Sequence, residues 1–228
     1  MRFVAAILAA LAFAAAEARS GVPESVAFER STAEGRPILL SGILLRPDGA
    51  GPFPAVVLLH HCDGMVGAQI AWAFRLAQWG YATLRVDSFT PRGEVSVCEQ
   101  PLSVNPFTRA DDAHAARAWL AARPDIDRRR IGVIGWSHGG SAAVLSVRKI
   151  AGARAEPFRA AIAFYPWCPD QLVDLDAPLQ ILIGDADDWT PADRCRDMRQ
   201  VGRTDQSVTL LASGFQNDKL VCFNEFPD

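Results

Sequence analysis

The chain has 228 residues, of which 50% are hydrophobic and 21% are charged, and its formal net charge is −3. This length suits one large α/β domain with a sizeable core. The absence of a basic run or an acidic block from the sequence argues against nucleic acid as a partner and against electrostatic membrane binding.

The first twenty residues, MRFVAAILAALAFAAAEARS, have the composition of an export signal. A positive charge at Arg2 precedes an apolar run from Phe3 to Ala16, and Ala16-Glu17-Ala18 has the small-x-small pattern of a cleavage site. The run is shorter than the roughly 20 residues of a membrane span. A buried N-terminal helix is the alternative. We predict a signal peptide over 1–18, a single domain over 19–228 without stable membrane insertion, and a secreted or periplasmic location.

The mature chain predicted in this way alternates strands and helices. The segments 25–30 and 37–47 read as an antiparallel hairpin. From Phe53 onward, buried apolar strands alternate with helices at the spacing of crossover units. We expect strands at 53–61, 81–89, 130–136, 158–166, 179–185 and 207–211, with helices at 68–80, 108–124, 139–152 and 191–202. This order predicts a mostly parallel central sheet with helices on both faces, whose chemistry collects at the carboxyl ends of the strands.

One of these strand ends carries the pattern G-x-S-x-G. It comprises Gly135-Trp136-Ser137-His138-Gly139 and lies between the apolar strand RIGVI and a plausible helix. Glycines give a strained turn the space it needs, and such a turn lifts a serine above the sheet edge. We therefore predict that Ser137 is a nucleophile, the alternative being a structural glycine-rich turn.

Two further strand ends supply the other parts of a hydrolytic site. The backbone N–H groups of His138 and Cys62 are the predicted oxyanion donors, and Gly64 would let the loop after 53–61 turn toward the serine. The segment ILIGDADDWTP supplies Asp185, Asp187 and Asp188, and one of these carboxylates is the predicted acid partner of a histidine. Ordinary helix capping is the alternative for this cluster.

These motifs together resemble the dienelactone hydrolase family of the α/β-hydrolase superfamily, and in particular its exported bacterial members. The resembling stretches are AVVLLHHCDG, GYATLRVDSFTPRG, RIGVIGWSHGG, FRAAIAFYPWC and ILIGDADDWTPADRC. The resemblance implies an α/β-hydrolase fold and hydrolysis of small esters or lactones through an acyl-enzyme on Ser137, with Asp187 as the acid and no cofactor. It leaves the oligomeric state open between monomer and homodimer.

The sequence departs from the family pattern at the general base. Family members carry a histidine after the last strand, whereas SVTLL here continues as ASGFQNDKLVCFNEFPD. We expect an atypical or truncated C-terminal end. The chain's histidines are His60, His61, His114 and His138. His60 and His61 could approach Ser137 from the oxyanion loop, whereas the ring of His138 should point away. The alternative function is an impaired or inactive relative, a binding protein or frameshifted product without the triad histidine.

Three side chains are predicted to contact substrate: Arg92, which could hold a carboxylate in a two-pronged contact, His61 and Trp136. A solvated surface arginine is the alternative for Arg92.

Five cysteines in an oxidising compartment predict at least one disulfide and one odd thiol. Cys168 with Cys195 and Cys62 with Cys98 are reasonable pairs, although sequence does not fix connectivity. Because no cysteine or histidine spacing suits zinc, no metal site is predicted.

Overall fold

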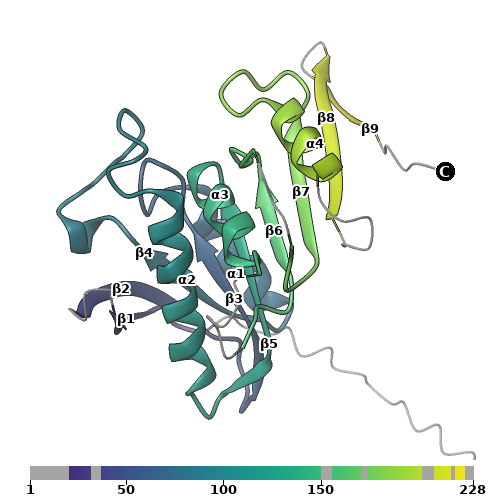
Figure 1. Cartoon of the computed structure of the whole chain (residues 1–228). Helices are drawn as coiled ribbons and strands as arrows, with labels where there is room; N and C mark the ends of the chain where they lie inside the picture. The colour runs from purple at the N-terminus through teal and green to yellow at the C-terminus, as the bar shows by residue number, and fades with distance from the viewer. Residues whose placement is uncertain are drawn as a thin grey trace, which may run out of the picture.

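The computed structural model of the chain describes residues 21–31, 37–149, 156–170, 174–201, 208–216 and 219–223. The predicted signal peptide over 1–18 lies outside these residues. Within them the chain forms one nine-stranded sheet in the order β1-β2-β4-β3-β5-β6-β7-β8-β9 (Figure 1).

The centre of the sheet is parallel and its two edges are antiparallel. The strands are β1 (Glu24–Ser31), β2 (Pro37–Leu45), β3 (Phe53–Leu59), β4 (Ala82–Asp87), β5 (Ile126–Trp136), β6 (Ala161–Phe164), β7 (Leu179–Gly184), β8 (Val208–Gln216) and β9 (Lys219–Phe223). Neighbours from β4 to β8 run parallel, whereas β1–β2, β2–β4 and β8–β9 are antiparallel. The predicted opening hairpin and mostly parallel sheet are confirmed.

Helices cover both faces of this sheet because each central strand is apolar on both sides. Helix α1 (Ala68–Gln78) packs on one face, where Val56 and Leu58 of β3 point. Val57 and Leu59 point to the other face, into a core shared with α2 (Pro106–Ala121), α3 (His138–Ser146) and α4 (Ala192–Val201). The continuous apolar run from Phe53 thus reflects burial on two sides, as expected for a parallel sheet.

Two elements differ from the prediction at their ends. Helix α3 ends at Ser146 instead of continuing to residue 152, because the chain after it bonds to another segment: Lys149 N–H donates to the Asp174 carbonyl (2.9 Å) and Asp176 N–H to the Val147 carbonyl (2.8 Å). Strand β8 continues past the predicted 207–211 to Gln216, and β9 then pairs with it. The atypical C-terminal segment therefore adds an antiparallel edge to the sheet.

The long loop between β4 and α2 is folded over the carboxyl ends of the strands. It begins with the short 3-10 helix η1 (Thr90–Arg92), and its residues Phe89, Val97 and Val104 form a small buried cluster against Cys62. The Val97 N–H donates to the Cys62 carbonyl (2.7 Å), and a disulfide joins Cys62 to Cys98. This loop is therefore fixed to the segment that follows β3.

Candidate active site

Ser137 occupies a sharp turn between β5 and α3. Its backbone angles are φ 52° and ψ −120°, which places a non-glycine residue in the left-handed region. The flanking glycines allow this turn: a Cβ on Gly135 would lie 2.0 Å from the Gly139 carbonyl oxygen, and one on Gly139 would lie 2.3 Å from that of Leu59. The strand–turn–helix context expected for G-x-S-x-G is therefore present, with the backbone strain that is common at functional residues.

The two predicted oxyanion donors lie on segments that meet at this turn. His138 is the first residue of α3, so its N–H belongs to the first helical turn, whose donors have no partner within the helix. Cys62 follows β3, and the chain turns back after it at Gly64, whose φ is 91°. The disulfide from Cys62 to Cys98 was a predicted pair and is confirmed, as is that from Cys168 to Cys195.

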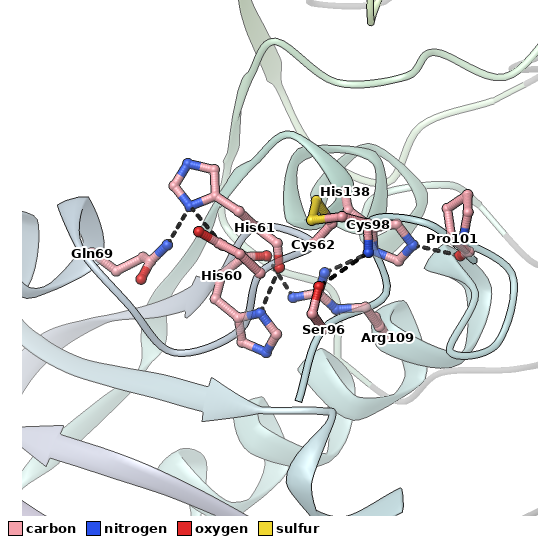
Figure 2. Close-up of a disulfide and its surroundings, with 10 residues drawn as sticks. His60, His61, Cys62, Gln69, Ser96, Cys98, Pro101, Arg109 and His138 are labelled. Atoms are coloured by element: carbon pink, nitrogen blue, oxygen red, sulfur yellow. Dashed lines mark hydrogen bonds and ion pairs between the residues drawn. A yellow bond between two sulfur atoms is a disulfide. The ribbon is translucent and has the colours of Figure 1, made fainter. Parts of the chain in front are cut away.

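A fully buried arginine connects these two segments. Arg109 of α2 donates from Nη2 to the His60 carbonyl (2.7 Å), and its Nη1 lies 2.8 Å from His138 Nδ1 (Figure 2). The opposite nitrogen of that ring, His138 Nε2, lies 2.7 Å from the Pro101 carbonyl oxygen, which can only accept. His138 is thus neutral, with its proton on Nε2. Arg109 therefore holds the loop after β3 and the helix after Ser137 in a fixed relation.

Three of the four imidazoles are engaged in structural contacts. Burial and then Arg109 lower the pKa of His138 to about 4. Burial also holds the pKa of His60 well below its ordinary value, and its two ring nitrogens meet the His61 carbonyl (2.7 Å) and the Ser88 N–H (3.4 Å). His114 lies on α2 with Nε2 2.8 Å from the Ser146 carbonyl oxygen. The predicted orientation of His138 is consistent with these contacts.

His61 lies after β3 at the carboxyl edge of the sheet, and both of its ring nitrogens meet side chains. Its Nε2 lies 2.8 Å from Tyr165 Oη and its Nδ1 lies 2.6 Å from Gln69 Nε2. Figure 2 shows the Gln69 side chain reaching the ring from α1. Burial lowers the pKa of His61, while Asp63, 3.8 Å from Nδ1, opposes that shift. A direct substrate contact of His61 stays a prediction, because both ring nitrogens already have protein partners.

Asp187 organises the loop that follows β7. Its Oδ1 accepts from the backbone N–H groups of Trp189 (3.0 Å) and Thr190 (2.8 Å), and its Oδ2 accepts from the Thr190 hydroxyl (2.8 Å). These are the capping contacts that were the alternative to a catalytic role. A carboxylate has about four acceptor positions, so it can also accept a further hydrogen bond. Its role as catalytic acid stays a prediction.

Two predicted substrate contacts have other partners in the structure. The Arg92 guanidinium makes a two-pronged ion pair with Asp112 (2.9 and 2.8 Å) and donates to the Ser88 carbonyl (2.6 Å). The Asp112 carboxylate is 0% exposed and also binds Arg30. Trp136 is 2% exposed and stacks on Phe164 in the core beside α1. Arg92 therefore neutralises a buried carboxylate, and Trp136 belongs to the core.

Tyr165, Gln69 and Arg109 are site residues that sequence reasoning missed. Tyr165 follows β6, and it is the other non-glycine residue of the described chain with a positive φ, 36°. Its place near the carboxyl end of the predicted strand 158–166 was the available signal, because parallel strand ends meet at one edge. Arg109 and Gln69 lie in helices whose pattern shows no such signal.

Comparison with known proteins places this geometry in a family. The sequence model of the dienelactone hydrolase family matches residues 40–212. The chain belongs to the dienelactone hydrolase family. The fold agrees: a candidate dienelactone hydrolase from Klebsiella pneumoniae superposes with a TM-score of 0.67 at 22% identity, over 84% of this chain and 85% of that one. A dienelactone hydrolase-like promiscuous phosphotriesterase from metagenomic libraries gives 0.66 at 19% identity, over 85% and 82%. The α/β-hydrolase fold is thereby confirmed.

Relatives of this dienelactone hydrolase family member are distant in sequence. A candidate 2-oxo-3-(5-oxofuran-2-ylidene)propanoate lactonase from Bradyrhizobium is 26% identical over 165 residues, which are 64% of each chain. Two uncharacterised Mycobacterium tuberculosis proteins are 31% identical over 102 residues, 36% of each chain. The chain thus spans less than two thirds of the length of these relatives. Family membership supports hydrolase function and a small-molecule substrate.

The described residues lack two other features, a metal-binding cluster and a membrane-spanning helix. Among them, no group of three or more histidine, cysteine or acidic side chains could hold a metal ion. Within the same part of the chain, no helix is long and apolar enough to cross a membrane.

Proposed function

We propose that this family member is a serine hydrolase that cleaves small carboxylic esters or lactones through an acyl-enzyme on Ser137. The observation that carries the proposal is the strained turn of Ser137 (φ 52°) directly before the N-terminus of α3. A serine in this position attacks a carbonyl carbon while the helix N-terminus and the nearby N–H groups stabilise the oxyanion. Water then hydrolyses the acyl-enzyme and releases the acid.

The surroundings of Ser137 support an acyl transfer reaction. The segment with the predicted Cys62 donor is fixed from two directions, by the disulfide to Cys98 and by Arg109 on the adjacent His60 carbonyl. Donors that are already in position need no rearrangement when charge develops on the substrate, and this is the main source of oxyanion stabilisation. The lactonase relative from Bradyrhizobium acts, by its name, on a lactone. A lactone or small ester is therefore the proposed substrate class.

Labelling with a fluorophosphonate, followed by intact mass, tests this function. The wild-type protein should gain one adduct, and Ser137→Ala should gain none. Ser103→Ala changes an exposed serine outside the turn and should label like wild type. A folded wild-type protein that gains no adduct would overturn the proposal and favour the alternative, a relative that binds small molecules without turning them over.

We also propose that the chain is exported, as the sequence of residues 1–18 predicts. The two disulfides support this location, because such bonds persist in oxidising compartments and are rare in the cytosol. Cell fractionation with N-terminal sequencing tests it: the mature protein should begin at Arg19 in the periplasmic or extracellular fraction. Recovery of the chain in the cytosol with Met1 intact would contradict it.

A further inference from the structure

Two strained residues lie on neighbouring strand ends. Strands β5 and β6 pair in parallel, with Trp136 beside Phe164, and the Ser137 N–H donates to the Phe164 carbonyl (2.9 Å). Tyr165 is therefore the residue next to this contact. Its φ of 36° is unfavourable for an aromatic residue, because a Cβ clashes with the backbone in this region. Strained non-glycine residues persist only where the surrounding structure holds them, and they cluster at active sites.

The hydroxyl of Tyr165 is the end of a hydrogen-bonded row of side chains. Tyr165 Oη lies 2.8 Å from His61 Nε2, the two rings stack with their centroids 6.0 Å apart, and His61 Nδ1 meets the Gln69 amide at 2.6 Å. The row joins the ends of β6 and β3 to α1. His61 is thus oriented at both ring nitrogens, as the base of a catalytic unit must be.

The row also satisfies what a proton acceptor requires. Gln69 is 1% exposed, and its Oε1 is buried without a partner in the orientation of the structure. Exchange of the two amide ends places this acceptor on His61 Nδ1, which then carries the proton. The lone pair of Nε2 is then directed at the Tyr165 hydroxyl. Both ring nitrogens of His60 and of His138 already meet backbone groups or Arg109, and His114 Nε2 meets the Ser146 carbonyl oxygen on α3.

We propose that Tyr165 and His61 are the proton-transfer residues of this site. This inference rests on the proposed function of Ser137. As the Ser137 Oγ–carbon bond forms, the Oγ–H proton passes to Tyr165 Oη, and the Tyr165 proton passes to His61 Nε2. When the carbon–oxygen bond to the leaving group breaks, the same path returns one proton to the leaving alkoxide. In the second half of the reaction, a water molecule gives a proton to the same path as it attacks the acyl carbon, and the path returns a proton to Ser137 Oγ as the acyl–Oγ bond breaks. Charge and protons therefore balance over the cycle.

The charges around the pair favour these protonation states at neutral pH. Burial, and then the carboxylates of Asp63 and Asp187, raise the pKa of Tyr165, so the phenol keeps its proton until the transfer occurs. Burial and Arg109 lower the pKa of His61, whereas Asp63 raises it. The imidazole is therefore neutral at about pH 7 and can accept a proton. Asp63, 3.8 Å from Nδ1, stabilises the imidazolium once it forms.

The rate constant for fluorophosphonate labelling of Ser137 tests the pair directly, since fluoride leaves without a proton. Tyr165→Phe and His61→Gln should each slow labelling by about 10²-fold or more, the usual contribution of general base catalysis. The double variant should be no slower than either single variant, because residues that act as one unit are not additive. Tyr81→Phe changes the other tyrosine and His114→Gln changes a histidine on α2, and both controls should label at the wild-type rate.

The pH profile separates a proton-transfer role from a structural one. The wild-type labelling rate should rise with pH to a plateau, with a midpoint below the ordinary histidine pKa of about 6.5, and His61→Gln should lose this rise. Gln69→Glu keeps the shape of the side chain and places a carboxylate on Nδ1, so the midpoint should move to higher pH.

Each outcome of these measurements decides the inference. Normal labelling of Tyr165→Phe or His61→Gln, additive effects in the double variant, or an unmoved midpoint in Gln69→Glu would overturn the proton-transfer pair. The proposed function would then stand, because Ser137 would still be labelled. A wild-type protein that does not label at all would overturn both.

Discussion

Glycines at the Ser137 turn carry a specific steric requirement. Gly139 approaches the Leu59 and His60 carbonyl oxygens so closely that a Cβ would lie 2.3 and 2.4 Å from them. Both atoms are backbone, so they can move only if the end of β3 moves. Cys62, the predicted oxyanion donor, follows this end of β3. The close approach of Gly139 to the end of β3 therefore matters both for stability and for the position of the oxyanion donor.

We expect Gly139→Ala to lower the free energy of unfolding by about 1–3 kcal/mol or more, the usual cost of overpacking. Urea unfolding measures it. Gly132→Ala is the matched control on β5, because its nearest atom would lie 3.4 Å from the new Cβ, an ordinary contact. Equal unfolding midpoints for Gly139→Ala and wild type would contradict the steric account.

Arg92 illustrates how a residue placed well by sequence can have a different partner. Its loop lies at the carboxyl end of β4, as predicted, but the guanidinium binds the buried Asp112. A guanidinium suits this task because its planar fork matches a carboxylate at two points. The sequence offered no sign that Asp112 would be buried on the inner side of α2.

Arg92→Met should therefore destabilise the fold by about 1–3 kcal/mol, less than the loss of an isolated buried ion pair because Arg30 also binds Asp112. Asp112→Asn in the same chain should recover part of this loss, which a double-mutant cycle measures. The KM values for an anionic lactone and a neutral ester should change alike. A selective rise for the anionic substrate would instead assign Arg92 to substrate binding.

At the scale of elements, the loop between β4 and α2 is attached to the loop after β3 by a covalent bond and a hydrogen bond. Cys62 and Cys98 are separated by 36 residues, and the Val97 N–H donates to the Cys62 carbonyl. Because a disulfide restricts the unfolded chain, its removal should lower stability by about 2–4 kcal/mol. The loop would also lose a fixed position beside Ser137.

Replacement of Cys62 and Cys98 together by serine tests this attachment. The double variant should unfold at a lower urea concentration and label more slowly at Ser137. Asn105→Ala is a useful control, since it removes only the contact from the Thr108 N–H to the Asn105 side chain at the start of α2, worth about 1 kcal/mol. Unchanged labelling in the cysteine variant would show that the hydrogen bonds alone hold the loop.

Sequence patterns predicted the elements that depend on residues close together in the chain. Strand β3 follows from a continuous apolar run, and the Ser137 turn follows from glycine spacing. The early end of α3 could not be predicted in this way, because bonds to residues 174 and 176 override the helix-forming residues after Ser146. Tyr165 was missed for a related reason: its hydrogen bond to His61 joins residues 104 positions apart in the chain. Local patterns therefore predicted the strands and the Ser137 turn, whereas contacts between residues far apart in the sequence determined the rest of the site.

At the scale of the whole molecule, buried neutral histidines predict sensitivity to acid. The pKa of His138 is about 4 in the fold, against about 6.5 unfolded, and that of His60 is also lowered. Below about pH 6.5 the unfolded chain binds protons that the folded chain does not bind. Stability should therefore fall from about pH 6.5 to about pH 4, by on the order of 3 kcal/mol for His138 alone.

Urea unfolding at several pH values across this range measures the effect. In His138→Gln the slope should be smaller, because one of the histidines with a lowered pKa no longer titrates. A free energy of unfolding that stays constant between about pH 6.5 and pH 4 would contradict this account, because the folded and unfolded chains would then bind the same number of protons.

The two disulfides have a practical consequence for anyone who produces this protein. Both bonds lie in segments that border the serine, one through Cys62 after β3 and the other through Cys168 after β6. A chain that begins at Arg19, made in a reducing bacterial cytoplasm, would share its sequence and mass, within a few protons, with the mature chain exported through an oxidising compartment. The two batches would nevertheless differ in how the loops around Ser137 are held. A thiol titration of each batch should therefore accompany any specific activity that is quoted for it.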